Sequence, residues 1–184
     1  MADVTQISGV ASTPQPDCVG HIVMPGAFGR VDPRSIRMLG HHDHKSIIGK
    51  WTKIEMSGDN LVVEGEIHDA IYDGQQIAAQ LKVAPLELSV GFLIDDADLI
   101  ETDDGIFYLV INKAELREIS VVTWGCAVGT SVTAEKRLTT EDQISATLKQ
   151  MSSSVQGMTA QQPSLSDRIK AEADRLNSIA RKYA

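Results

Sequence analysis

The stretch SIIGKWTKIEMSGDNLVVEGEI, residues 46–67, decides the fold class. Strand-like runs flank the central SGDN, whose Gly58 and Asn60 are residue types that adopt turn conformations. Alternation of apolar and polar side chains with a period of two is typical of strands that bury one face. The stretch therefore predicts a β-hairpin.

Further strands and turns follow the same pattern along the chain. Strands are predicted at residues 4–12, at 20–29 (where a proline and glycines close the run), at 86–94, and as two strands within 106–124 that join near Lys113 and Ala114. Helical spacing predicts a helix over 73–83 with Asp73 as its N-cap, and 95–104 is predicted to be an acidic loop. These elements predict an α+β fold that is mainly β, a largely antiparallel barrel of about seven strands with one or two flanking helices.

The last fifty residues differ in character from the rest. We expect one domain over 1–134, a polar linker over 135–164 and an amphipathic helix over 165–184 with Ser166 as a plausible N-cap. The helix fits three roles equally: a docking or scaffold-like segment, a helix packed on the domain, or a dimer contact.

Composition narrows the class of function. The chain has 184 residues and a formal net charge of −8, which argues against non-specific nucleic-acid binding. It contains no apolar run of membrane-spanning length and no signal-peptide pattern, so no membrane partner is expected. Two cysteines, Cys18 and Cys126, are too few for a disulfide framework, and free thiols in a reducing, intracellular setting are expected.

The tetrapeptide HHDH at residues 41–44 allows three interpretations: a metal site, a catalytic base or a polar turn at a strand end. A metal site would draw on the nearby ligand types His42, Asp43, His44, Cys18 and His21. On a strand, however, only His42 and His44 share a face, and zinc usually takes three or four protein ligands. We therefore expect no metal ion and no cofactor.

Three other side chains are candidates for chemistry. Ser89 in LSVGF is a candidate nucleophile or a polar position on the barrel wall, and Gly91 beside it would admit a substrate or another backbone. Cys126 in TWGCAVG is a second candidate nucleophile or a buried free cysteine. Glu118 in LREISVV either faces inward among apolar residues, where it needs a partner, or lies on the solvent face.

The order of four motifs is more specific than any one of them. In chain order the motifs are GHIVMPGAFG, IRMLGHHDHKSIIGKW, LELSVGF and LREISVVT. With these motifs in this order, the chain resembles over about residues 5–132 the caudovirus prohead maturation proteases of the HK97 type, which are distantly similar in fold to herpesvirus assemblin. The resemblance implies a serine endopeptidase whose triad is Ser89, His42 and Glu118.

The resemblance also suggests an oxyanion hole, partners and a location. Candidate backbone donors are those of Val90, Gly91, Cys126 and Ala127, although the arginines of assemblin are absent from the last two positions. The implied substrates are viral scaffold and major capsid proteins and the chain itself. The implied location is the interior of the prohead in the infected host cytoplasm. A homodimer or higher oligomer is one form in which the enzyme could act.

Two rival functions stay open at this point. A non-catalytic β-barrel assembly module of a virion predicts that Ser89 Oγ lies more than about 6 Å from His42, well beyond hydrogen-bond reach. A metal hydrolase predicts that His42, Asp43 and His44 converge on one ion.

Overall fold

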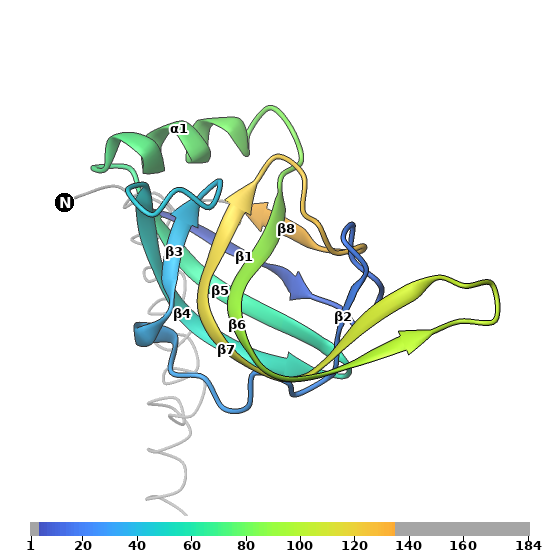
Figure 1. The fold of residues 1–184 in the computed structure, drawn as a ribbon. Coiled ribbons are helices and arrows are strands. Elements are labelled where there is room, and N and C mark those ends of the chain that lie inside the picture. Colours follow the sequence, from blue (N-terminus) through green and yellow to red (C-terminus); the bar gives the residue numbers. More distant parts are fainter. Residues whose placement is uncertain (1–3, 135–184) are drawn as a thin grey trace, which may run out of the picture. The chain divides into compact units, whose positions relative to one another are not determined.

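Strands dominate the computed structural model, which describes residues 4–134 of the chain, all within the compact unit Met1–Arg137 (Figure 1). The strands are β1 (Val4–Ser12), β2 (His21–Val23), β3 (Arg37–Gly40), β4 (Ile47–Ser57), β5 (Asn60–His68), β6 (Glu87–Glu101), β7 (Phe107–Val122) and β8 (Ser131–Ala134). A 3-10 turn at Pro33–Ser35 and the helix α1 (Tyr72–Gln80) complete the elements of this part.

All eight strands belong to one curled sheet. Its order is β2-β7-β3-β4-β5-β1-β8, and β6 pairs with β7. Five strand pairs are antiparallel, and two, β2–β7 and β3–β7, are parallel. The N–H of Val132 in β8 donates to the carbonyl of Leu86 (3.3 Å), which brings the far edge of the sheet back to the start of β6. The predicted mainly β, largely antiparallel barrel is therefore confirmed.

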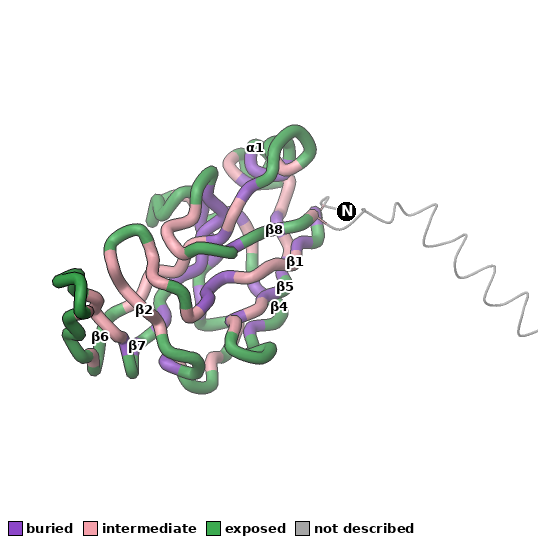
Figure 2. Tube along the Cα trace, turned by 90° about the vertical axis from the view of Figure 1, so that its right-hand side faces the viewer, coloured by how far each residue is buried: buried purple, intermediate pink, exposed green. Residues whose placement is uncertain are grey.

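The core lies inside the curled sheet, where Figure 2 shows the buried positions gathered along the facing strands. Its fully buried members include Ile7, Met38, Ile48, Leu88 and Ile119. Each comes from a different strand, so burial of apolar area holds the strands around a common centre. Helix α1 adds its Ile77 and Ala78 to this core, and Figure 1 shows the helix above one end of the barrel.

The predicted hairpin at residues 46–67 is present as β4 and β5, and the predicted strand at 4–12 is β1. The predicted helix is also present, but its N-cap is Ile71, which makes no side-chain capping bond, and the helix ends at Gln80. Asp73 instead lies in the first turn, where its charge is favourable to the helix dipole. The expected N-cap and end of this helix are thus wrong.

The chain around 95–124 differs most from expectation. The predicted acidic loop is largely strand, because β6 continues to Glu101, and β7 runs unbroken where two strands were predicted. The two strands form a long hairpin that projects beyond the barrel in Figure 1. Register shifts at Ile94/Asp96 and Asp96/Ala97 bend it. Solvent reaches much of the hairpin, so acidic residues are tolerated in a strand there and the alternation that marks a strand is lost.

The expected linker over 135–164 and helix over 165–184, including Ser166, lie outside the described residues. Among the residues described, α1 is the only α-helix, and it is too short and too polar to cross a membrane.

Candidate active site

Two neighbouring antiparallel strands carry the candidate nucleophile and the candidate carboxylate. Ser89 and Gly91 on β6 lie directly opposite Ser120 and Glu118 on β7. Residues two apart on a strand share a face, and directly opposite residues point to the same side of a sheet. The register therefore places Ser89, Ser120 and Glu118 on one face, with Gly91 facing the glutamate.

The candidate base, His42, follows β3, which pairs with β7 on the opposite edge from β6. Strand β3 pairs in parallel with β7 and ends at Gly40, and residues 41–45 then form a turn. Both His41 and His42 have left-handed backbones, with φ of 53° and 59°. Left-handed backbones disfavour residues with a Cβ, so they persist only where surrounding bonds hold them. Here the N–H of His41 donates to Val121 O (3.0 Å) and that of His42 to Ser120 Oγ (3.1 Å).

This turn corrects the strand geometry assumed for HHDH. His42 and His44 do not lie on a strand, so the argument that they share a strand face is wrong. The Asp43 carboxylate accepts a hydrogen bond from the N–H of Lys45 within the same turn.

The structure brings the three predicted triad residues together. His42 Nε2 lies 2.8 Å from Ser89 Oγ, and His42 Nδ1 lies 2.7 Å from Glu118 Oε1. Ser120 Oγ donates to the other carboxylate oxygen, Glu118 Oε2, over 2.6 Å. The Glu118 side chain is only 6% exposed, whereas that of His42 is 45% exposed. Of the two orientations considered for Glu118, inward-facing or on the solvent face, the structure therefore has the inward-facing one. Both oxygens of Glu118 have partners, which burial of a carboxylate requires.

Gly91 gives Glu118 the room to reach His42. A Cβ on Gly91 would overlap Glu118 Oε1 and lie 2.9 Å from Glu118 Cδ. The space beside this glycine is thus filled by the glutamate side chain, where a substrate or another backbone had been expected.

The electrostatics of the pair favour a protonated imidazole. The hydrogen bond that His42 donates to Glu118 raises the pKa of His42 above its usual value, while partial burial opposes this shift and the charge of the carboxylate adds to it. An imidazolium formed at His42 is therefore stabilised, which is what a general base needs once it has accepted a proton.

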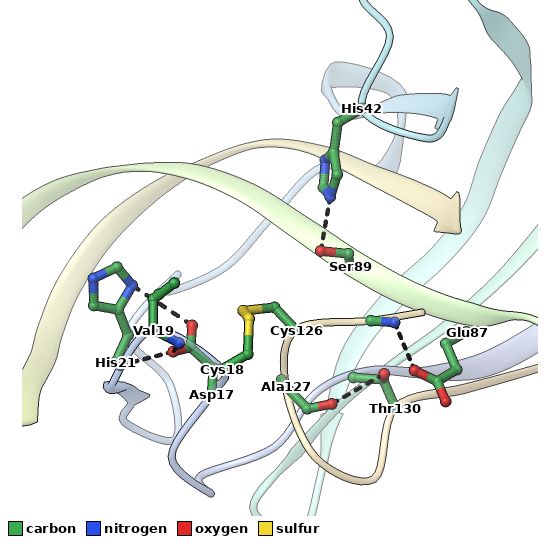
Figure 3. The surroundings of a disulfide bond; sticks show 11 residues. Asp17, Cys18, Val19, His21, His42, Glu87, Ser89, Cys126, Ala127 and Thr130 are labelled. Carbon is green, nitrogen blue, oxygen red and sulfur yellow. Dashed lines mark hydrogen bonds and ion pairs between the residues drawn. A yellow bond between two sulfur atoms is a disulfide. The ribbon is translucent and has the colours of Figure 1, made fainter. Parts of the chain in front are cut away.

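The two cysteines form a disulfide, so the expectation of free thiols and of a Cys126 nucleophile is wrong. Cys18, in the β1–β2 connection, bonds to Cys126, in the β7–β8 connection, with the Cα atoms 4.9 Å apart. The N–H of Cys18 also donates to the carbonyl of Cys126 (2.9 Å). Although 108 positions separate them, an antiparallel bridge between Asp17 and Ala127 brings their loops together. In the view of Figure 3 Ser89 lies between His42 and this disulfide.

Glu87 anchors the second of these loops beside the nucleophile strand. It lies two residues before Ser89, and its Oε2 accepts the N–H of Gly125 over 2.6 Å (Figure 3). Sequence reasoning missed Glu87, Ser120 and the disulfide. Spacing offered a signal for the first two, because each lies two residues from a predicted site residue on the same strand face.

The backbone N–H groups of Val90 and Gly91, two of the candidate oxyanion donors, point to opposite edges of β6. Along β6 the backbone groups of alternate residues point to opposite edges. Because the carbonyl of Leu86 faces β8, the N–H of Val90 also faces away from β7, while that of Gly91 faces β7. Val90 therefore lies on the open edge of β6. A small pocket there is lined by Ser89, Val90, Phe92, Cys126 and Ala127, together with residues from the end of β1 through β2.

No group of three or more histidine, cysteine, aspartate or glutamate side chains is placed to hold a metal ion within residues 4–134. His42, whose two ring nitrogens face Glu118 and Ser89, does not converge with Asp43 and His44 on a common point.

Comparison with known proteins adds a family match. The family model of the caudovirus prohead serine protease matches residues 7–148. Among solved structures, the protease of KSHV in complex with a hexapeptide phosphonate inhibitor is similar at 9% sequence identity and a TM-score of 0.42, over 82% of this chain and 77% of that chain. A likeness at this level carries no conclusion about activity. No curated protein sequence is significantly similar to the chain.

Proposed function

Because the chain belongs to the caudovirus prohead serine protease family, we propose that it is a serine endopeptidase whose triad is Ser89, His42 and Glu118. The observation that carries this proposal is the unbroken chain of contacts from Ser89 Oγ through the imidazole to Glu118, at 2.8 and 2.7 Å. Nucleophilic catalysis by serine requires a base within hydrogen-bond reach and a group that orients the base.

The proposed reaction follows from this geometry. Ser89 Oγ attacks the peptide carbonyl as His42 Nε2 takes its proton, and the same imidazole then returns the proton to the leaving amine. Glu118 accepts the Nδ1–H of His42, which keeps Nε2 unprotonated toward Ser89 in the resting site and stabilises the imidazolium during attack. Water, activated by His42, then releases the acyl group from Ser89.

Donors for the oxyanion are proposed on the pocket side of β6. Val90 supplies an N–H at the open edge next to Ser89, and Cys126 and Ala127 line the same pocket. Gly125 is a poorer candidate, because its N–H is already bonded to Glu87. A donor of this kind typically lowers the barrier by about 3 kcal/mol.

A specific distance favours catalysis over a purely structural virion module. The module predicts a gap of more than about 6 Å between Ser89 and His42, outside hydrogen-bond reach. The 2.8 Å contact and the buried, fully partnered Glu118 are instead what a working triad needs.

We further propose that the substrates are the scaffold and the scaffolding segments of the major capsid protein, and that the chain also cleaves itself. The family match supports this, since prohead proteases act on capsid assemblies from within the procapsid. Host cytoplasm as the setting and a homodimer or higher oligomer as the active form are parts of the same proposal.

The test uses co-expression of the chain with its capsid protein. Ser89→Ala and His42→Ala are expected to fold and to leave the capsid precursor uncut, whereas His44→Ala, in the same turn but outside the triad, should cut it. Circular dichroism checks folding, and intact mass reads cleavage. Processing by either triad variant at the wild-type level would refute the proposed triad, and loss of cleavage in His44→Ala together with bound stoichiometric metal would favour the metal hydrolase.

A further inference from the structure

We propose that Ser120 is a positioning residue of this site, one hydroxyl that holds both the carboxylate and the base of the proposed triad. The inference rests on the proposed function and extends it to a residue outside the triad. Ser120 Oγ touches two groups, the backbone N–H of His42 (3.1 Å) and Glu118 Oε2 (2.6 Å).

The direction of each hydrogen bond is determined by chemistry. A backbone N–H can only donate, so Ser120 Oγ accepts from His42. The single hydroxyl proton is then free to point at Glu118 Oε2, which accepts it. With Oε2 occupied in this way, the carboxylate is anchored in rotation and presents Oε1 to His42 Nδ1.

The second bond acts on the base. His42 has a left-handed backbone that a residue with a Cβ rarely adopts. The N–H of His42 finds its acceptor in Ser120, which lies on the neighbouring strand and not in the turn itself. Ser120 thereby ties the backbone of the base to the strand that carries the carboxylate.

Ser120 is buried, so water cannot readily replace its hydroxyl as a hydrogen-bond partner of Glu118 and His42. It is fully buried in β7, between β3 and β6, and stands opposite Ser89 in the register. Without the hydroxyl, the buried Glu118 Oε2 and the His42 N–H would both lose the partner that they have in the structure. The sheet itself does not depend on the hydroxyl, because its ladder is made by backbone groups.

The experiment compares Ser120→Ala with Ser120→Thr, which keeps a hydroxyl, and with Thr5→Val as a matched control. Thr5 is also buried and bonds a carboxylate, Asp69, but on β1 and outside the site. A fluorophosphonate probe measures the rate of labelling of Ser89, and cleavage of the capsid precursor gives kcat and KM separately. The far-downfield proton resonance of His42 Nδ1–H reports directly on its bond to Glu118.

We expect Ser120→Ala to lower kcat and the labelling rate by roughly 10- to 100-fold, the effect of losing one bond to a charged group, with KM nearly unchanged. The Nδ1–H resonance should shift or broaden, Ser120→Thr should regain at least part of the rate, and Thr5→Val should keep it. Wild-type kcat and labelling in a folded Ser120→Ala would overturn the proposal, as would an equal loss in Thr5→Val. Failure of the proposed function would look different: wild-type cleavage would then not depend on Ser89.

Discussion

Glu118 can reach His42 because Gly91, which lies opposite it on β6, has no side chain. The carboxylate occupies the space that a Cβ at Gly91 would need. We therefore expect Gly91→Ala to displace Glu118 and reduce the rate of capsid precursor cleavage by at least about 100-fold, because an orienting carboxylate is typically worth more than that.

Gly58→Ala is the matched control for this substitution. Gly58 has a φ of 58° in the β4–β5 turn, and a Cβ there would meet no atom within 4 Å. The control should lose about 1–2 kcal/mol of stability through backbone strain alone while it keeps its cleavage rate. If Gly91→Ala cleaves as fast as Gly58→Ala, the close approach of Glu118 has no catalytic consequence.

Glu118→Gln tests the electrostatic role of the carboxylate through the pH profile of kcat/KM. Catalysis needs neutral His42, and Glu118 raises the pKa of His42 above its ordinary 6.5. The wild-type rate should therefore rise with pH through a midpoint above pH 6.5, and the midpoint should move to lower pH in the variant. The rate itself should fall roughly 10³- to 10⁴-fold, since an amide favours the wrong tautomer.

The control for this pH experiment is Glu115→Gln, three residues away on β7 but exposed and paired with Arg117. Its profile should match that of the wild type. An unmoved acid limb in Glu118→Gln would mean that the 2.7 Å contact does not govern the charge of His42.

At the scale of the elements, the loops that carry Cys18 and Cys126 border the pocket beside Ser89. We expect the double variant Cys18→Ala, Cys126→Ala to lose about 2–4 kcal/mol of unfolding free energy, as is typical for a disulfide. Its cleavage rate should also fall, because the covalent link between the two loops is then lost and only hydrogen bonds, among them Glu87–Gly125 and the backbone bond between positions 18 and 126, hold the loop beside Ser89.

Denaturant unfolding and cleavage, each with and without a thiol reductant, check this expectation. Reductant should lower the stability and rate of the wild type toward those of the double variant and leave the variant itself unchanged. A wild type that is indifferent to complete reduction, verified by thiol titration, would contradict a role for the bridge in the site.

Secondary structure was predictable where one face of a strand is buried. The alternation in residues 46–67 predicted β4 and β5 because that hairpin covers the core. The outer part of β6 was expected to be an acidic loop, because neither face of the projecting hairpin is consistently buried and the alternation of side chains is lost there. At residues 41–44 a polar turn was one of three interpretations, but the pattern did not indicate that His41 and His42 have left-handed backbones.

At the scale of the whole molecule, the sequence motifs predicted which side chains meet but not how they are held. Ser89, His42 and Glu118 come together because β7 is the shared neighbour of β3 and β6. That adjacency depends on a sheet order with parallel neighbours, and the pairing of Cys18 with Cys126 depends on a bridge between Asp17 and Ala127 in two distant loops. Local sequence patterns encode neither.

Metal independence is a prediction for the intact protein. Both ring nitrogens of His42 face protein groups, so a chelator should leave the rate of capsid precursor cleavage unchanged after exhaustive dialysis. Cleavage assays before and after EDTA treatment, with elemental analysis of the same samples, make the comparison. Metal independence would be contradicted if EDTA abolished cleavage and one equivalent of a divalent ion restored it.

The most direct test of the central claim is the intact mass of the capsid precursor after co-expression with the wild-type chain or with Ser89→Ala. The proposed triad predicts a shortened capsid protein with the wild type and only the full-length precursor with Ser89→Ala, although both chains fold. The same shortened product in both samples would contradict it.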